Sequence, residues 1–220
     1  MKKILMSLMA LMLVIGLVGA GTMAYFSDTE TSVSNAFVAG TLNLKVADTD
    51  EPATDGVTGT WTAGPIAPGA AATSAWVELT NSGNLAANHV EIDFAIGNVN
   101  VVTDPEIGAD DADIRDSIDV TVMTYGTTVV TNLLLQTVPG TFDNAALQAA
   151  DVAGNDDDVI QLSELDGVNL DNLVPIPTPN SVQAERFTMA IQLQSGTGNG
   201  NQGDSVTLTL TFYLNQDTSQ

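Results

Sequence analysis

The sequence predicts an all-β protein, an antiparallel two-sheet jelly-roll sandwich with short helical and loop insertions. Three observations predict this fold class. About seven segments alternate apolar and polar residues with a period of two, as strands with one buried face do. Such alternation is typical of antiparallel strands, whereas parallel strands are usually apolar throughout. Glycine, proline and asparagine residues separate the segments, and this many short strands fit a two-sheet sandwich.

The first three expected strands lie in the N-terminal half of the chain. Residues 41–46 alternate apolar and polar side chains directly after a glycine. Residues 73–81 repeat that pattern over a longer stretch. Residues 89–96 place four apolar side chains on one face, opposite His89 and Glu91. We therefore expect these strands to turn one face to a core and the other to solvent.

Four more strands are expected in the C-terminal half. Residues 117–124 and 127–136 are separated by Gly126, which favours a tight turn between them. Residues 182–194 place Phe187, Met189, Ile191 and Leu193 on one face. Residues 205–214 alternate valine, leucine and phenylalanine with threonine and tyrosine. The last segment has the strongest strand pattern of the chain.

Residues 137–180 interrupt the strand pattern and are expected to form a lobe on the sandwich. A short helix is expected at 143–150, capped by Asp143. Three prolines within residues 175–179 exclude a central strand there. Because no linker or internal repeat separates the lobe from the rest, residues 41–220 are expected to form one β-sandwich domain with an insertion at about 137–180.

Residues 1–24 have the features of a secretory signal peptide. Lys2 and Lys3 precede an apolar run over residues 4–18, and Thr22 to Ala24 fit the small-residue pattern of a cleavage site. The apolar run is shorter than the roughly 20 residues of a membrane span. We therefore expect secretion to the outside or surface of the cell. A retained anchor is the alternative, and the uncleaved leader would be the only contact with a membrane.

The charge balance excludes several classes of partner. The chain holds 27 acidic residues against 5 basic ones, with a net charge of −22. Beyond the leader only Lys45, Arg115 and Arg186 are basic. Nucleic acid is excluded, since binding it requires neutralising phosphates with lysine and arginine. The acidity suits either a solvation shell for salty surroundings or loops that bind calcium. The absence of cysteine excludes disulfides and thiol chemistry.

The sequence predicts no enzymatic activity, no catalytic residue and no required cofactor. His89 is the only histidine, so the two imidazoles of an H-E-x-x-H zinc site cannot form. A serine nucleophile would need the same histidine, and no G-x-S-x-G motif is present. His89 is expected to be an outward-facing strand residue.

One acidic segment is a candidate calcium site. Residues 153–164 partly match an EF-hand loop, which needs oxygen ligands at fixed positions. Ala153 and Asp158 break the pattern, so a standard EF-hand is not expected. A looser calcium site and a solvated acidic loop remain the two interpretations. The ligands of the looser site are Asp151, Asn155, Asp157 and Glu164. The acidic segments 48–55 and 104–116 are weaker candidates.

Three parts of the chain resemble the TasA/camelysin family of secreted proteins. They are GTMAYFSDTETSVSNAFVAGTLNL at residues 21–44, PIAPGAAATSAWVELTNSGNLAANHVEIDF at 65–94, and TLTLTFYLNQ at 207–216. The resemblance implies a jelly-roll subunit whose leader is removed by a dedicated signal peptidase. It also implies polymerisation into biofilm matrix fibres or bundling pili by donor-strand exchange. Relatives of camelysin have also been classed as metallopeptidases.

Residues 25–40 are the donor-strand segment that the resemblance implies. A strand added to an open sheet edge gains backbone hydrogen bonds, and its alternate side chains set the register. The residues suited to this role are Phe26, Thr29, Thr31, Val33 and Phe37, with Gly40 as the hinge. The alternative interpretation is a frayed terminus or a first strand that folds back on its own domain.

The sequence thus predicts a secreted structural subunit of an extracellular filament. Its partners would be further copies of itself, joined head to tail, and other matrix or pilus subunits. Two alternatives stay open. One is a monomeric surface or matrix protein that binds calcium or another ligand, and the other is a camelysin-like metallopeptidase.

Overall fold

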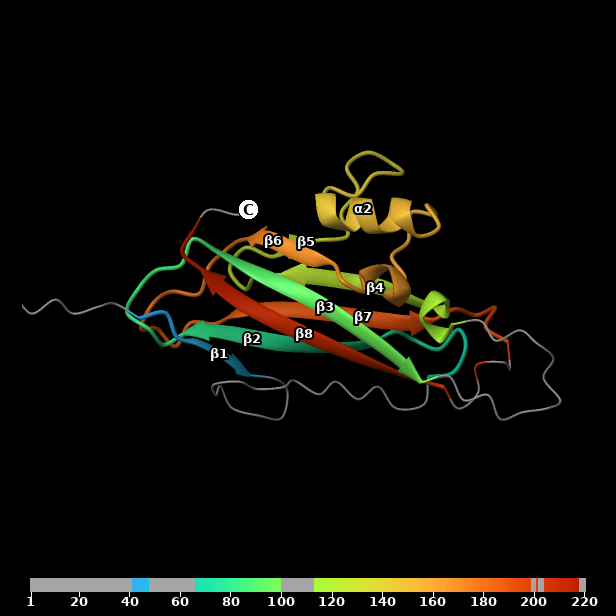
Figure 1. Ribbon diagram of the computed structural model, residues 1–220, viewed down its shortest axis with the longest axis horizontal. Helices are drawn as coiled ribbons and strands as arrows, with labels where there is room; N and C mark the ends of the chain where they lie inside the picture. Colours follow the sequence, from blue (N-terminus) through green and yellow to red (C-terminus); the bar gives the residue numbers. More distant parts are fainter. Residues whose placement is uncertain (1–40, 48–65, 100–112, 199–200, 202–203, 218–220) are drawn as a thin grey trace, which may run out of the picture. The chain divides into compact units, whose positions relative to one another are not determined.

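Two antiparallel sheets form the core of the protein, as the ribbon in Figure 1 shows. The computed structural model describes residues 41–47, 66–99, 113–198, 201 and 204–217. The leader at 1–24 and the expected donor segment at 25–40, with Phe26, Val33 and Gly40, lie outside these residues. Contacts divide the chain into two units, Met1–Ala39 and Gly40–Gln220, and the elements below belong to the second.

The larger sheet has five strands in the order β1-β2-β7-β4-β5, and every pairing is antiparallel. Its strands are β1 (Leu44–Ala47), β2 (Thr73–Asn81), β7 (Glu185–Leu193), β4 (Ile118–Tyr125) and β5 (Thr131–Asn132). The smaller sheet has three strands in the order β6-β3-β8, also antiparallel. Its strands are β6 (Asn169–Leu173), β3 (His89–Val99) and β8 (Ser205–Asn215).

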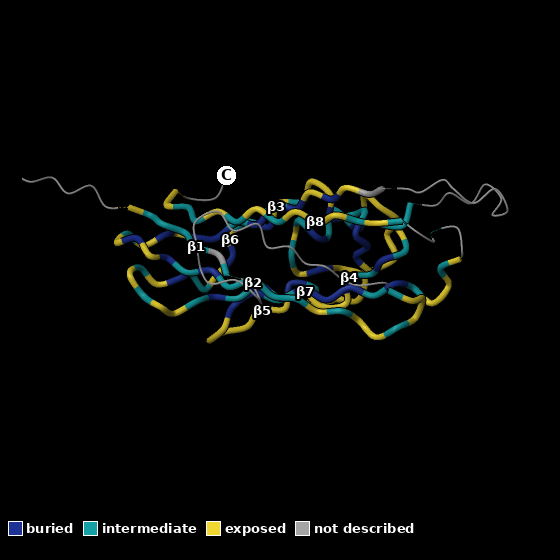
Figure 2. Tube along the Cα trace, turned by 90° about the horizontal axis from the view of Figure 1, so that it is seen from below, coloured by how far each residue is buried: buried dark blue, intermediate teal, exposed yellow. Residues whose placement is uncertain are grey.

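The two sheets face each other across an apolar core, and Figure 2 shows them as two layers that both contain buried residues. Val90, Ile92 and Phe94 of β3 are buried, as the period-two pattern predicts. Phe187 of β7 lies at the centre of the core. Its ring stands edge-on to Phe94 and to Phe212, each with ring centroids 6.1 Å apart. The all-β sandwich expected from the sequence is confirmed.

Short helices lie in the connections. α2 (Ala145–Ala153) ends at Gly154, and η1 (Ile114–Ser117) and η2 (Leu162–Leu165) are single 3-10 turns. The helix expected at 143–150 is present, but its cap is Asn144, whose side chain accepts hydrogen bonds from the backbone of Ala146 and Leu147. The expected cap, Asp143, instead accepts from Thr137.

Two expectations about strands are wrong. Residues 127–136 were expected to form one long strand, yet only Thr131–Asn132 pairs with β4. Gly126 has a φ of 107° and begins a wider turn. Residues 126–130 belong to this turn, so the strand cannot begin before Thr131. Within the lobe, β6 was not expected, because its sequence NLDNL contains three polar residues. Since β6 pairs with β3, part of the 137–180 insertion belongs to the sandwich itself.

The outer edges of β6 and β8 in the smaller sheet have no partner strand among the described residues. Among the residues that the structure describes, β8 pairs with β3 alone. Its inward-facing apolar side chains are only half-buried, whereas those of β3 are buried. The half-buried side chains of β8 are Val206, Leu208, Leu210, Phe212 and Leu214. Within the described residues, the core is therefore less completely covered along β8 than along β3.

No helix within the described ranges is long and apolar enough to cross a membrane.

Candidate functional site

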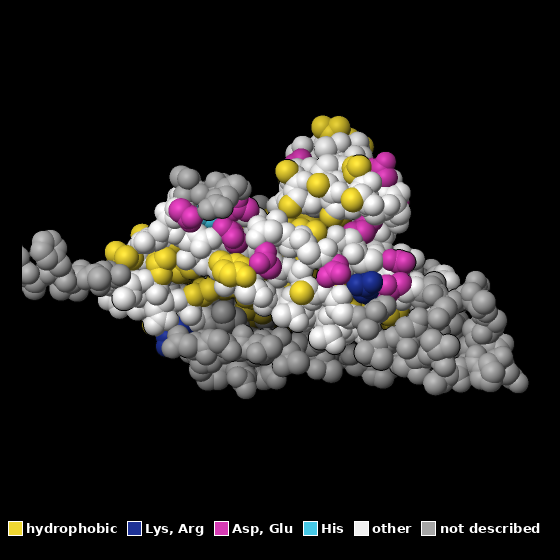
Figure 3. All heavy atoms as spheres, viewed as in Figure 1, with side chains coloured by type: hydrophobic (Ala, Val, Ile, Leu, Met, Phe, Trp, Pro, Cys, Tyr) yellow, Lys and Arg dark blue, Asp and Glu magenta, His cyan; other side chains and the backbone are white. Residues whose placement is uncertain are grey.

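A group of polar side chains lies on the outer face of the smaller sheet. The alternation of β3 points Val90 and Ile92 into the core and therefore His89 and Glu91 away from it. Figure 3 shows acidic side chains gathered around the single histidine on this face. The sequence predicted the direction of His89 correctly, but its 2% exposure was not expected for an outward-facing residue.

A bulge in β6 adds a third residue to the group. The register of β3 and β6 pairs Val90 with Leu173 and Ile92 with Leu170, so two residues of β6 lie opposite Glu91. These are Asp171 and Asn172, and Asn172 has a φ of 59°. A bulge of this kind changes the direction of a side chain relative to a regular strand. Here it accompanies the approach of Asp171 to His89.

The imidazole of His89 is in direct contact with both carboxylates. His89 Nε2 lies 2.9 Å from Glu91 Oε1 and 3.2 Å from Asp171 Oδ1. Glu91 Oε1 also accepts a hydrogen bond from Asn215 Nδ2 of β8. The hydrogen bond with His89 is the main cause that lowers the pKa of Glu91, and burial opposes it. The cluster is thus a nitrogen atom and two carboxylates gathered at one point.

The cluster has the number and type of ligands that a divalent cation needs. One ligand atom from each of His89, Glu91 and Asp171 lies within 4.8 Å of the others. Catalytic zinc sites commonly use three protein ligands of nitrogen and oxygen type and leave a position for water. His89 Nδ1, however, is buried and has no hydrogen-bond partner among the described residues. A zinc-bound imidazole usually donates from its second nitrogen, so we expect the cluster to hold a cation weakly.

Further polar groups continue this face along β3. Asp93 accepts a hydrogen bond of 2.5 Å from Asn169 Nδ2 of β6. Its interaction with Tyr213 of β8 raises the pKa of that phenol. A carboxylate, an amide and a phenol thus lie on the same sheet face as the His89 cluster.

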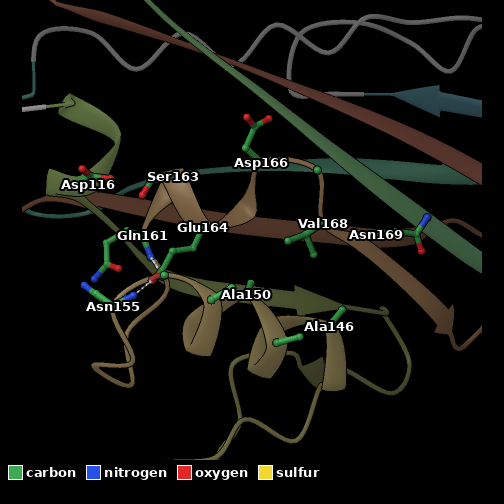
Figure 4. Close-up of a pocket in the computed structure, with 14 residues that line it drawn as sticks. Asp116, Ala146, Ala150, Asn155, Gln161, Ser163, Glu164, Asp166, Val168 and Asn169 are labelled. Carbon is green, nitrogen blue, oxygen red and sulfur yellow. Dashed lines mark hydrogen bonds between the residues drawn. The ribbon is translucent and has the colours of Figure 1, made fainter.

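Of the candidate calcium ligands of the sequence, Asp151 lies in the last turn of α2 and Glu164 in η2, while Asn155 and Asp157 lie in the loop between them. Glu164 accepts hydrogen bonds from the backbone of Asn155 and Gln161, as Figure 4 shows beside a cleft of about 830 Å³. Asp157 accepts from Asn155 Nδ2. The structure therefore brings Asn155, Asp157 and Glu164 together, but Asn155 forms hydrogen bonds with both carboxylates. Asp151 lies buried beside them.

Comparison with known proteins assigns a family. Residues 1–220 match the family described as Camelysin metallo-endopeptidase. The chain belongs to this family. The resemblance to the TasA/camelysin family seen in the sequence is thereby confirmed. No curated protein matches the chain.

The family corrects one prediction. Absence of enzymatic activity was expected from the single histidine and the missing catalytic motifs, and this is wrong because the camelysin family is described as one of metallo-endopeptidases. Motif spacing tests only contiguous signatures, so it could not reveal the His89 cluster. The cluster instead joins two residues of β3 with one from a bulge about eighty residues later in the chain. The pair His89 and Glu91, two apart on a strand, was its only visible signal.

Proposed function

We propose that this camelysin-family chain is a secreted subunit that polymerises into an extracellular filament, a biofilm matrix fibre or a bundling pilus. Assembly proceeds by N-terminal donor-strand exchange after removal of the leader at residues 1–24. The observation that carries the proposal is the edge of β8, which is unpaired within the described part of the chain. Such an edge presents a row of free N–H and C=O groups to a further strand.

The β8 edge offers both backbone hydrogen bonds and an apolar face for side chains, the two requirements for binding an added strand. Over Ser205–Asn215 its backbone can pair with an incoming strand, and its half-buried apolar face leaves room for inserted side chains. The proposed donor is residues 25–39 of the next subunit. Phe26, Val33 and Phe37 would fill the apolar gap, since aromatic and branched side chains gain most from burial.

The proposed contact extends without closing. Donor and acceptor are different surfaces of one chain, so each added copy presents a new acceptor, and other matrix or pilus subunits with the same donor can join. The net charge of −22 opposes this association through repulsion. Salt or bound cations, for which we propose calcium, would reduce that repulsion.

Deletion of residues 25–39 tests the proposal. The mature chain is expected to form fibres visible by electron microscopy, and the deleted chain to remain a folded monomer by light scattering and circular dichroism. A synthetic peptide of residues 25–39 should bind the deleted chain, because its β8 edge is free. Fibres from the deleted chain would contradict strand donation, and monomers from both chains at high protein and salt concentration would reject the filament.

A second candidate function is metal-dependent hydrolysis of peptide bonds, favoured by the His89 cluster. His89, Glu91 and Asp171 would hold the cation. A bound cation would lower the pKa of a water molecule and polarise a peptide carbonyl. Asp93 is the nearest carboxylate along the same face of β3 and would accept a proton there.

Asp171→Asn tests this function, because Asp171 is partly exposed and its loss leaves the buried ring of His89 in place. The mature chain with zinc is expected to cleave an unstructured protein, and chelator should stop cleavage. The variant should lose at least the roughly 10- to 100-fold that removal of an outer partner costs. Asp119→Asn, on the other sheet, is the matched control. Cleavage that survives both chelator and Asp171→Asn would exclude this site.

A further inference from the structure

A buried carboxylate in the lobe has an oxygen without a partner. Asp151 lies in the last turn of α2 and is fully buried, with 0% exposure. Its Oδ1 accepts a hydrogen bond of 3.2 Å from the backbone N–H of Asp158. Its Oδ2 is also buried and has no hydrogen-bond partner among the described residues. The carboxylate therefore points into the loop that follows α2 and is only half satisfied there.

Nothing in this part of the chain neutralises that charge. Residues 116–185 contain no lysine, arginine or histidine. Burial raises the pKa of Asp151, and the neighbouring charges of Asp156, Asp158 and Asp157 raise it further. Buried charges in proteins are normally paired or coordinate a metal. A bound cation would satisfy the free oxygen of Asp151 and also neutralise its charge, without changing the protonation of the loop.

Two further carboxylates of the loop are available. Asp156 and Asp158 have φ values of 54° and 67°, in the left-handed region that few residues other than glycine adopt. Neither side chain makes a hydrogen bond to another described residue, whereas both backbone N–H groups donate to Asp151. The N–H of Asp156 donates to the backbone carbonyl of Asp151 and that of Asp158 to its carboxylate, so the loop folds back on Asp151 and leaves its own two carboxylates without hydrogen bonds to described residues.

The other acidic residues of the loop hold its shape. Asp157 accepts hydrogen bonds from the backbone of Val159 and from the side chain of Gln161. Glu164 lies against Gly154 so closely that a Cβ there would be 2.0 Å from its Oε1. These contacts fix the loop between α2 and η2 with the Asp151 carboxylate inside it. Asp157 and Glu164, expected from the sequence as ligands, act here as its supports.

We propose that this loop closes on a calcium ion, with the buried carboxylate of Asp151 as its anchor. Asp156 and Asp158, whose carboxylates are not gathered with that of Asp151 within 4.8 Å in this structure, would move in as further ligands. All these donors are oxygens, which calcium prefers, and no nitrogen or sulfur ligand is available that would favour zinc. Calcium also tolerates irregular coordination completed by water, whereas magnesium demands a strict octahedron. The site goes beyond the proposed filament function and does not depend on it.

Calcium titration of the mature chain tests the site. At calcium about a hundredfold above its Kd, the melting temperature should rise by roughly 5–10 °C. Amides of residues 154–164 should exchange more slowly with deuterium, and magnesium at equal ionic strength should have a much smaller effect. An unchanged melting temperature and unchanged exchange in that segment would overturn the proposal.

Asp151→Asn separates this site from the others, since asparagine can still accept the hydrogen bond from Asp158. The variant should melt at the same or a higher temperature without calcium, because an unpaired buried charge is gone, and should lose the calcium shift. Glu91→Gln, in the His89 cluster, should keep the shift. Loss of the shift in Glu91→Gln with retention in Asp151→Asn would place the ion at the other cluster. A lower melting temperature of Asp151→Asn without calcium would also contradict the proposal.

Discussion

Leu210→Lys in β8 is expected to abolish fibre formation while the subunit stays folded. Leu210 faces inward from the edge strand and is only half-buried, so a lysine there can extend its ammonium group past the open edge into water. An inward-pointing charge on an edge strand prevents pairing with another strand. The loss should be complete, because each added subunit must pass through the same contact. Electron microscopy and sedimentation of the mature variant measure it.

Thr209→Lys is the matched control for this substitution. Thr209 is the neighbouring residue of β8 and lies on the exposed outer face, so its lysine adds the same charge without entering the apolar gap. Fibres should form from this variant. If both lysines abolish fibres, added charge near the edge is the cause rather than blocked insertion. If neither does, β8 is not the acceptor.

The sandwich could be predicted because most of its strands bury one face. The period of two survives over most of β8 and over residues 89–96 of β3, since each strand separates core from solvent. Residues 127–136 look similar but mostly form a turn, because the pattern records polarity and not the geometry imposed by Gly126. β6 was missed for the opposite reason. Its asparagines and aspartate lie on the outer face and in the bulge. Its sequence therefore has the polar composition that is typical of a loop.

The functional groups were less predictable than the fold, because they depend on register. His89 and Glu91 are visible in the sequence as neighbours on one strand face, but Asp171 joins them only through the β6 bulge. Likewise, the acidity of residues 151–164 was visible, yet which carboxylate is buried depends on how the loop closes on α2. Spacing therefore pointed to this segment, while the choice of Asp151, Asn155, Asp157 and Glu164 as its ligands stays a prediction.

The two proposed functions of the β-sandwich share one strand. Asn215 of β8 donates to Glu91 in the His89 cluster, and Tyr213 of β8 contacts Asp93 on the same face. The opposite edge of β8 is the proposed acceptor. Strand addition would order β8 along its whole length and thereby hold Asn215 and Tyr213 in position beside Glu91 and Asp93. We therefore expect any metal affinity of the cluster to be higher in the fibre than in the monomer.

Phe187→Ala is expected to cause the largest loss of folding stability among core substitutions. Phe187 is 1% exposed on the central strand β7 and contacts rings from both strands opposite, Phe94 of β3 and Phe212 of β8. Truncating such a ring removes its transfer free energy and leaves a cavity, at a cost of about 3–5 kcal/mol in the free energy of unfolding. For a chain of this size the melting temperature should fall by roughly 6–20 °C.

Urea unfolding of the mature chain at low protein concentration measures this loss. Val182→Ala is the matched control, because Val182 is fully exposed and its truncation should change the free energy of unfolding by less than about 0.5 kcal/mol. Phe187→Leu should fall between the two, since leucine refills part of the cavity. Phe187 joins the edge strand β8 to the core, so Phe187→Ala should also weaken fibre formation. A stable, fibre-forming Phe187→Ala would show that β8 is held by its pairing with β3 alone.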